Sequence, residues 1–435
     1  MSDTITKIEL TYNGSKVKGI LLKEKEDEYS LKLASGYQIA ISKKDASDVQ
    51  TKTEEVASTN HSIEVNNDES LPNIAIFHTG GTIASKVDYA TGAVSSKFTP
   101  EELINLFKEL QNKANLQAFM VGNLSSEDMR FGHYNMLLEN ITKHAKDFDG
   151  IIISHGTDTL HYSSAALQYG IENLNIPVIL VGAQRSSDRA GSDSYLNLDA
   201  AIEFITYNYN LKKQNKPTFN RVGICMHSSI NDDGFYILDA INAKKMHSSR
   251  RDAFKQINFP PACEISKEYE IFNKREELFT LLPKNKISYQ KYDESLRVGI
   301  FMPHPHLCKE EIESLEMYDG VILANTGLGH MGISEFDEIS KYNEESFKAL
   351  QKVVKKIPVC LGVQTVYGQV NLNVYSPGRK LLEIGVLGNH TGLIVETQFA
   401  KLAHLLSKHK GKKITNEMWM DDLEGFDSQR LVDLE

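Results

Sequence analysis

The sequence predicts an α/β fold, in which a two-domain core built on parallel sheets follows a small N-terminal β-barrel. Residues 5–45 contain short alternating runs separated by Asn-Gly, charged and glycine turns, which is typical of small antiparallel barrels. From Leu71 onward, short apolar runs alternate with longer segments of helical periodicity. A second and shorter series of the same kind begins near Leu296, which indicates a smaller second α/β domain.

The N-terminal runs read "KIELTY", "KVKGILLKE", "YSLKLAS" and "YQIAISK". They predict the strands of a barrel of Sm or SH3 type over residues 1–50. This segment holds eight lysines and eight acidic residues, so we expect no basic face on it. Residues 51–70 are polar and mostly acidic, and they read as a linker.

The large domain is expected over residues 71–265. Its runs "NIAIF", "GIIIS", "PVILVG" and "RVGICM" are apolar throughout, as in parallel strands that helices cover on both faces. Between two of them, apolar and small residues fall on one helical face: Leu160, Ser164, Leu167, Ile171 and Leu174.

The smaller α/β domain is expected over residues 296–435. It reads as "RVGIFM", a helix around 308–317, "GVILAN", a helix over 334–355 and "PVCLGV". Residues 266–295 are charged and aperiodic, and we expect them to be a connector.

Composition narrows the class of protein. A hydrophobic fraction of 41% and a charged fraction of 24% are those of a globular protein, and the net charge of −10 argues against non-specific nucleic-acid binding by the whole chain. No secretory signal and no apolar run of transmembrane length is visible. The four cysteines lie far apart, so we expect neither a disulfide framework nor a zinc ribbon, and a cytoplasmic location fits best.

Two apolar strands end in similar loops, residues 78–82 (His-Thr-Gly-Gly-Thr) and residues 155–159 (His-Gly-Thr-Asp-Thr). In an open parallel sheet, ligands bind beyond the carboxyl ends of the strands, so both loops should face one crevice. Glycines let backbone N–H groups reach an oxyanion, and a threonine hydroxyl is a candidate nucleophile if a neighbouring group takes its proton. The competing interpretation is that both threonines only cap helices.

These two segments, "LPNIAIFHTGGTIAS" and "DGIIISHGTDTL", resemble the signature segments of bacterial-type L-asparaginases. Shorter similarities follow in order along the chain: "NLSSEDM", "PVILVGAQR", "DAFK", "RVGIFM" and "YDGVILANTGLG". The resemblance covers residues 71–435 and implies the asparaginase fold.

The resemblance also implies roles for individual residues. Thr82 would be the nucleophile that forms an acyl-enzyme with the side-chain carbonyl of an amide amino acid, supported by Tyr89. Thr157 and Lys255 would assist proton transfer, while Asp158 would bind the α-ammonium of the substrate. The remaining residues expected at the substrate are Ser126, for the α-carboxylate, Glu127, Gly81 and Gly156. The resemblance implies no metal and no organic cofactor.

Three departures from the free-standing enzymes narrow the resemblance. Glu127 follows the serine where those enzymes usually carry Gln, and His330 stands where the secreted ones tend to have Asn. The extra carboxylate changes the charge around a zwitterionic substrate, so we expect it to disfavour simple asparaginase activity. The secreted enzymes also lack an N-terminal barrel. An asparaginase-like core behind a barrel is similar to the asparaginase-like D-type subunits of archaeal glutamyl-tRNA(Gln) amidotransferases.

That resemblance implies a glutaminase or asparaginase whose ammonia passes to a partner, an E-type subunit of the same complex. The partner would use ATP and Mg²⁺ to activate Glu-tRNA(Gln), and the chain would form a homodimer within a heterotetramer. The absence of a GxxxxGK[ST] loop from the sequence agrees with ATP chemistry outside this chain. Two alternatives stay open: a free-standing cytosolic L-asparaginase, and a non-catalytic scaffold that binds RNA or protein.

Two further motifs have the form of ligand sites. Residues 327–332 form a GxGxxG after a predicted strand, but the next strand ends in Gln364 rather than in the acidic residue that holds a ribose. His304, His306 and Cys308 alternate along one segment, without the paired spacing of zinc ligands. We therefore expect neither dinucleotide nor metal binding there.

Overall fold

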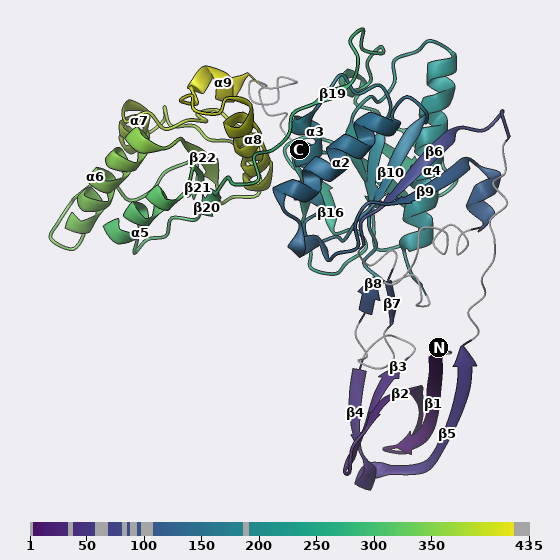
Figure 1. Cartoon of the computed structure of the whole chain (residues 1–435). Helices are drawn as coiled ribbons and strands as arrows, with labels where there is room; N and C mark the ends of the chain where they lie inside the picture. Colours follow the sequence, from purple (N-terminus) through teal and green to yellow (C-terminus); the bar gives the residue numbers. More distant parts are fainter. Residues whose placement is uncertain are drawn as a thin grey trace.

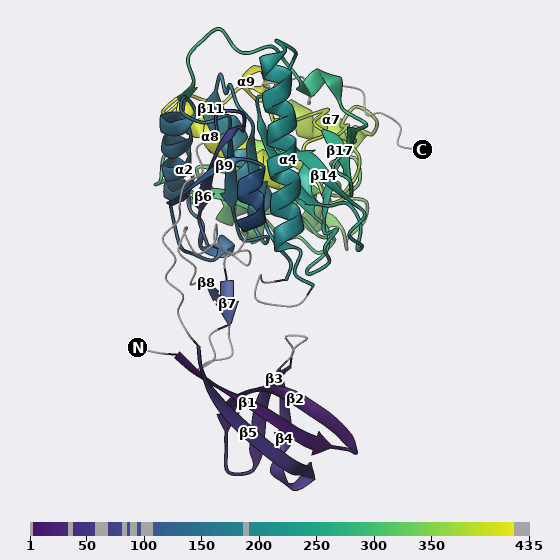
Figure 2. The same cartoon turned by 90° about the vertical axis from the view of Figure 1, so that its right-hand side faces the viewer.

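The computed structural model describes residues 3–33, 38–56, 68–80, 85–87, 94–96, 108–185 and 191–421. They form three units: an N-terminal antiparallel sheet, a large α/β unit and a smaller α/β unit (Figure 1). The N-terminal sheet lies apart from the other two units in both views (Figures 1 and 2). The α/β prediction is therefore confirmed.

The N-terminal sheet has five antiparallel strands in the order β4-β3-β2-β1-β5. The strands are β1 (Asp3–Tyr12), β2 (Ser15–Glu24), β3 (Glu28–Leu33), β4 (Gln38–Ser42) and β5 (Ala46–Val56). A small core of Ile8, Leu10, Leu31 and Ile41 lies beneath them. Among the described residues no pairing joins β4 to β5, so closure of the sheet into a barrel remains a prediction. β5 continues to Val56, six residues into the segment that we expected to be a linker.

The large unit is built on an eight-stranded sheet with the order β18-β17-β14-β13-β12-β10-β6-β9. The strands from β9 to β13 are parallel, and β14, β17 and β18 continue the sheet antiparallel. The bounds are β6 (Asn73–His78), β9 (Asn115–Met120), β10 (Gly150–Ser154), β12 (Val178–Val181), β13 (Val222–His227), β14 (Gly234–Asp239), β17 (Cys263–Ser266) and β18 (Ile271–Phe272). β18 belongs to the segment expected to be a connector, so the sheet extends into it.

Helices cover this sheet on both faces, as the apolar strands predict (Figure 1). They are α2 (Phe131–His144), α3 (Leu160–Gly170) and α4 (Ser194–Lys213). α3 ends at Gly170, earlier than the apolar periodicity predicts. Ile171 instead begins the short strand β11 (Ile171–Glu172), which pairs with β19 (Ser288–Tyr289). Tertiary pairing has therefore overridden the helical pattern at this point.

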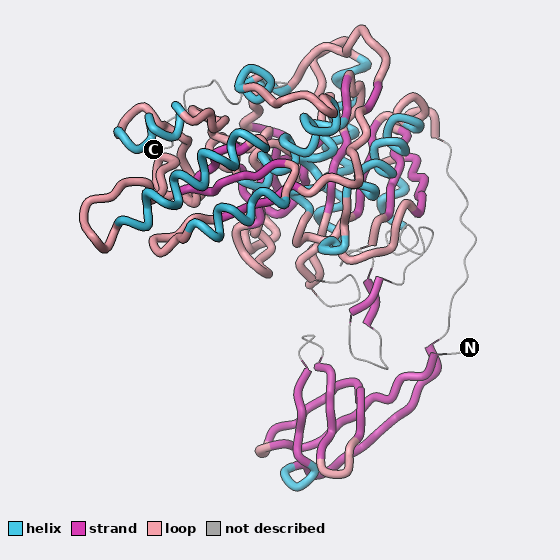
Figure 3. Tube along the Cα trace, turned by 60° about the vertical axis from the view of Figure 1, so that its left-hand side comes forward, coloured by secondary structure: helices cyan, strands magenta, loops and turns pink. Residues whose placement is uncertain are grey.

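The smaller unit has three parallel strands, β20 (Val298–Phe301), β21 (Gly320–Asn325) and β22 (Val359–Val363). Its helices are α5 (Lys309–Glu313), α6 (Lys341–Lys356), α7 (Ser376–Glu383), α8 (Val395–Lys408) and α9 (Asn416–Met420). α6 begins seven residues later than we expected. α8 packs against α3 as well as β20 and β21, so it joins the two α/β units (Figure 1). A view from another side shows the N-terminal sheet apart from these two units (Figure 3).

Short elements complete the described chain. Two hairpins are formed by β7 (Ser85–Val87) with β8 (Val94–Ser96) and by β15 (Ala243–Lys245) with β16 (Phe254–Gln256). The 3₁₀ turns are η1 (Lys43–Asp45), η3 (Lys108–Asn112), η4 (Ser126–Asp128), η5 (Glu276–Leu278) and η6 (Ser314–Met317). Within the described ranges, no helix has the length and apolarity needed to cross a membrane.

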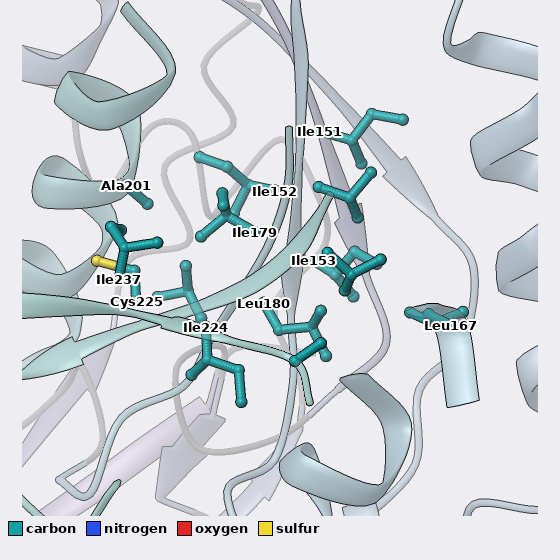
Figure 4. Close-up of a cluster of buried hydrophobic side chains, with 14 of the residues drawn as sticks. Ile151, Ile152, Ile153, Leu167, Ile179, Leu180, Ala201, Ile224, Cys225 and Ile237 are labelled. Carbon is teal, nitrogen blue, oxygen red and sulfur yellow. The ribbon is translucent and has the colours of Figure 1, made fainter. Parts of the chain in front are cut away.

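The centre of the large sheet is a dry layer of branched side chains (Figure 4). Ile152, Ile153, Ile179 and Leu180 have no exposed surface, because β10 and β12 are flanked by strands and covered by helices. Burial of this continuous apolar layer is the main force that fixes the strand order, since each buried side chain contributes about 1.5–3 kcal/mol.

Replacement of Ile153 by Ala tests this layer. We expect a loss of about 2–5 kcal/mol in the free energy of unfolding, because the change removes buried methylene groups and leaves a cavity. The measurement is denaturant unfolding followed by circular dichroism. Ile230→Ala is the control, because Ile230 is 58% exposed and its truncation should cost less than about 0.5 kcal/mol. Equal losses in the two variants would show that the layer does not carry the stability of the sheet.

Candidate active site

The two similar loops leave neighbouring parallel strands at the same edge of the sheet. His78, the last residue of β6, pairs in register with Ser154, the last residue of β10. Thr79 then donates from its backbone N–H (3.2 Å) and from its hydroxyl (2.8 Å) to the carbonyl oxygen of Ser154. The first loop is therefore fastened to the second where both begin.

Gly80 continues the first loop in a conformation that favours glycine, with φ of 109°. A Cβ atom at this position would collide with the backbone of Leu124. Only glycine allows this close approach. Gly81, Thr82 and Tyr89 lie outside the described residues, so their expected roles remain predictions.

The second loop packs against the turn that carries Ser126. A Cβ atom at Gly156 would lie 2.8 Å from the Cβ atom and 2.9 Å from the hydroxyl oxygen of Ser126. The hydroxyl of Thr159 donates to the carbonyl oxygen of Ser126 at 2.5 Å. Glu127 is exposed, and one of its carboxylate oxygens lies 3.5 Å from the Ser126 hydroxyl. The structure thus brings together Ser126, Glu127 and Gly156, three of the residues expected at the substrate.

A lysine completes the second loop, but it is Lys245 and not Lys255. The Nζ atom of Lys245 donates to the hydroxyl of Thr157 at 2.8 Å and to Oδ1 of Asp158 at 2.7 Å. Its side chain is 9% exposed, whereas that of Asp158 is 67% exposed. The cluster therefore has an amine with little exposure, a buried hydroxyl and a carboxylate that a ligand can reach.

Lys255, which we expected beside Thr157, lies elsewhere. Its Nζ atom donates to the carbonyl oxygen of Ser228 at 3.0 Å and lies over the ring of Tyr236. The reason is the register of the β15–β16 hairpin, in which Lys255 is paired with Lys244. Directly paired residues share a face and successive residues alternate, so Lys245 and Lys255 point to opposite faces.

No local signal in the sequence separates these lysines. Lys244, Lys245 and Lys255 all lie in one short segment, and the hairpin register that distinguishes them depends on long-range packing. The similarity of "DAFK" to a family motif points to the second strand of the hairpin. The contact with Thr157 and Asp158 is made from the first strand.

Gly182 is a further site residue that the sequence analysis did not single out. It follows β12, the neighbour of β10, and a Cβ atom there would lie 2.7 Å from the Cγ2 methyl group of Thr157. The loop after it is held by Asp193, which accepts hydrogen bonds from the backbone N–H groups of Gln184 and Arg185. This glycine gives the "PVILVGAQR" segment a physical role, because it makes room for Thr157.

Buried histidines surround the loops and remain neutral at pH 7. Burial lowers the pKa of His78, His155 and His161 to about 4 in each case. Nδ1 of His155 lies 2.7 Å from the carbonyl oxygen of Gly156, so this nitrogen carries the proton and donates it to the loop. His155 therefore orders the glycine loop. The neutral histidines add no positive charge beside Lys245.

The other motifs with the form of ligand sites have structural roles. The backbone N–H of Cys308 donates to Oε2 of Glu311 at the start of α5, and Nε2 of His304 lies 3.1 Å from Oε1 of the same residue. The GxGxxG segment does not open a helix, since α6 begins only at Lys341. In the part of the chain that the structure describes, no group of three or more His, Cys, Asp or Glu side chains could hold a metal ion.

The arrangement suits proton transfer at a small polar ligand. The hydroxyl of Thr157 is held by an amine, the amine is held by a carboxylate, and the carboxylate is open to solvent. A lysine in such a setting can exchange a proton with a hydroxyl at hydrogen-bond distance.

Comparison with known proteins agrees with this geometry. Residues 73–277 match the family model described as Asparaginase, N-terminal. The fold is similar to the thermostable L-asparaginase from Thermococcus kodakarensis, with a TM-score of 0.68 and 23% identity over 82% of this chain and 98% of that one. L-asparaginase I from Vibrio cholerae gives a TM-score of 0.66 and 22% identity with the same coverage. These similarities establish the fold.

The sequence relatives are more specific. The D subunit of glutamyl-tRNA(Gln) amidotransferase from Methanobrevibacter smithii is 34% identical over 412 residues, which is 93% of this chain and 88% of that protein. The D subunit of the same amidotransferase from Pyrococcus abyssi is 33% identical over 92% of this chain and 87% of its own length. Both similarities reach into the N-terminal region, because such coverage extends well beyond the asparaginase-like core. The chain therefore belongs to the family of glutamyl-tRNA(Gln) amidotransferase D subunits.

Proposed function

We propose that this chain is the amidase subunit of a tRNA-dependent amidotransferase. It hydrolyses the side-chain amide of Gln or Asn and supplies the ammonia to a partner that converts Glu-tRNA(Gln) to Gln-tRNA(Gln). The observation that carries the proposal is the similarity to amidotransferase D subunits over more than nine-tenths of the chain. The contact of Lys245 with Thr157 and Asp158 supports a working amidase and weighs against a decayed scaffold.

In the proposed reaction the hydroxyl of Thr82 attacks the side-chain carbonyl carbon of the substrate. The C–N bond breaks, ammonia leaves with a proton, and an ester joins the substrate to Thr82. Water then hydrolyses the ester, which releases Glu or Asp and restores the hydroxyl. Thr157 and Lys245 move the protons of these steps, so Lys245 takes the role that the family resemblance implies for Lys255.

Binding of the substrate follows from the charges of the site. Asp158 takes the α-ammonium group, since its carboxylate is exposed and is anchored through one oxygen on Lys245. Ser126, held against Gly156, takes the α-carboxylate. Tyr89 supports the nucleophile Thr82 while the substrate is bound.

The remaining functions belong to the complex. We propose that this chain binds no cofactor for hydrolysis and that ATP and Mg²⁺ are used by an E-type partner subunit. The chain would form a homodimer within a cytoplasmic heterotetramer. A free-standing asparaginase is not favoured, because the sequence relatives that span the N-terminal region are subunits of the amidotransferase.

Ammonia release tests the proposal directly. We expect the purified chain to release ammonia from Gln or Asn, and the rate to rise sharply when the partner subunit, ATP and Glu-tRNA(Gln) are added. Thr82→Ala should abolish release, since the acyl-enzyme cannot form. Full activity of the chain alone, unchanged by these additions, would contradict the transamidation role. Undiminished activity of Thr82→Ala would contradict the nucleophile.

A pair of lysine variants tests the corrected assignment. Lys245→Met should lower kcat for ammonia release by about 10²–10⁴-fold, the usual contribution of a positioned proton-transfer group. Lys255→Met should have a far smaller effect, because Lys255 lies on the opposite face of the hairpin. Steady-state kinetics of both variants would decide, and a larger loss in Lys255→Met would restore the original assignment.

The pH dependence of stability tests the neutral histidines. His155 has an ordinary pKa near 6.5 when the chain unfolds and a pKa of about 4 in the folded protein, because burial disfavours its charged form. The free energy of unfolding therefore holds the full contribution of neutral His155 above pH 6.5. It loses about 3 kcal/mol of that contribution as the pH falls to 4.

His155→Asn should flatten the decline of the free energy of unfolding between pH 6.5 and 4, measured by denaturant titration at several pH values. His306→Asn serves as the control, because His306 is exposed. An identical pH profile for His155→Asn and the unmodified chain would exclude His155 as the source of the decline.

A further inference from the structure

The lysine of the candidate site sits on a very short element. Lys245 is the last residue of β15, which pairs through only three residues with β16. An isolated two-stranded hairpin of this length is not stable in water by itself. Contacts from outside the hairpin must therefore fix the position from which Lys245 reaches Thr157.

The smaller unit holds both ends of the hairpin. Asn242, just before β15, donates from Nδ2 to the carbonyl oxygen of Gly392 at 2.9 Å and accepts from the N–H of Ile394 at 2.9 Å. Asn258, just after β16, donates from Nδ2 to the carbonyl oxygens of Gly392 (2.7 Å) and Gly368 (2.9 Å). The two asparagine side chains thus tie the ends of the hairpin to the backbone of the smaller unit.

One side-chain contact continues this link into the hairpin itself. Lys244 forms an ion pair with Glu396, in the first turn of α8, and the two side chains are 24% and 14% exposed. A carboxylate is stabilised in the first turn of a helix by the helix dipole. Because successive residues of a strand alternate, Glu396 contacts one face of β15 while Lys245 extends from the other.

The surroundings of this pair leave room for movement. Lys244 and Glu396 line a cavity of about 180 Å³ between the two α/β units, together with Tyr162, Asn258 and Gln364. Side chains that border a cavity are not held by packing on that side. The ion pair with Glu396 therefore holds the side chain of Lys244 where it borders this cavity.

We propose that Glu396, acting through Lys244, is a positioning residue. It holds β15 so that the side chain of Lys245 can donate hydrogen bonds to Thr157 and Asp158. Only the expected effect on catalysis rests on the proposed function, whereas the effect on the position of Lys245 does not. Glu396 belongs to the smaller unit and touches neither Thr157 nor Asp158 in the described contacts. Loss of the Glu396 charge releases the side chain of Lys244 from α8. The side chains of Asn242 and Asn258 still hold the two ends of the hairpin.

Glu396→Gln tests the proposal, since it removes the charge with little change of shape. We expect kcat for ammonia release to fall about tenfold, because small displacements of a catalytic group are costly, while KM stays nearly constant. Glu396→Asp keeps the charge and should recover part of the loss. The matched control is Glu172→Gln, which removes the same charge from a different contact with α8. Glu172 accepts from Lys408 of α8 at 3.1 Å, far along the helix from the hairpin.

A second readout follows Lys245 itself and does not require catalysis. Reductive methylation with formaldehyde and a borane reductant, followed by peptide mass spectrometry, gives the rate of modification at Lys245. This rate should rise severalfold in Glu396→Gln and stay unchanged in Glu172→Gln. Thermal unfolding should shift by a similar small amount in both variants.

The two readouts separate the possible outcomes. If the unmodified chain releases no ammonia but Lys245 is exposed to methylation only in Glu396→Gln, the positioning role holds and the amidase function fails. If methylation of Lys245 and kcat in Glu396→Gln match those of the unmodified chain, the positioning role is wrong. Equal changes of kcat and of Lys245 methylation in Glu396→Gln and Glu172→Gln would show that both pairs merely tether α8, which also overturns the proposal.

Discussion

The parallel pairing of β6 with β10 is the constraint on which the rest of the site depends. Parallel neighbours end at the same edge of a sheet, so the pairing of His78 with Ser154 brings the two threonine loops together. The next strand along, β12, then places Gly182 against Thr157 at the same edge. A change in the order of these strands would therefore separate these residues at once.

The strand order in turn depends on burial. The four central strands carry side chains without exposed surface, and a central position in a sheet covered by helices is the only place where such strands are stable. This explains why the fold was predictable from the sequence. Continuous apolar runs of five or six residues identify buried parallel strands without any knowledge of their partners.

Features set by long-range contacts could not be predicted in the same way. Ile171 and Leu174 continue the apolar face of α3, yet β11 ends the helix by pairing with a distant strand. The expectation that Lys255 lies beside Thr157 differs from the observed geometry for a similar reason. Three nearby lysines are equivalent in sequence, and only the register of β15 with β16 shows which one faces Thr157. The meeting of the two threonine loops, by contrast, followed from the strand ends alone.

The hairpin that carries Lys245 is held by the smaller unit, so the two α/β units are not independent parts of the core. All the site residues that the structure describes lie in the large unit, which alone would suggest an independent catalytic domain. Asn242 and Asn258, however, adopt φ values of 65° and 66°, a conformation uncommon for residues other than glycine. Such backbone is retained where the surroundings determine it, and here the surroundings are the carbonyl oxygens of the smaller unit. The hairpin therefore depends on the smaller unit for its conformation, while its Lys245 contacts Thr157 in the large unit. The large unit without the smaller one would hold Thr157 and Asp158, but not Lys245, in place.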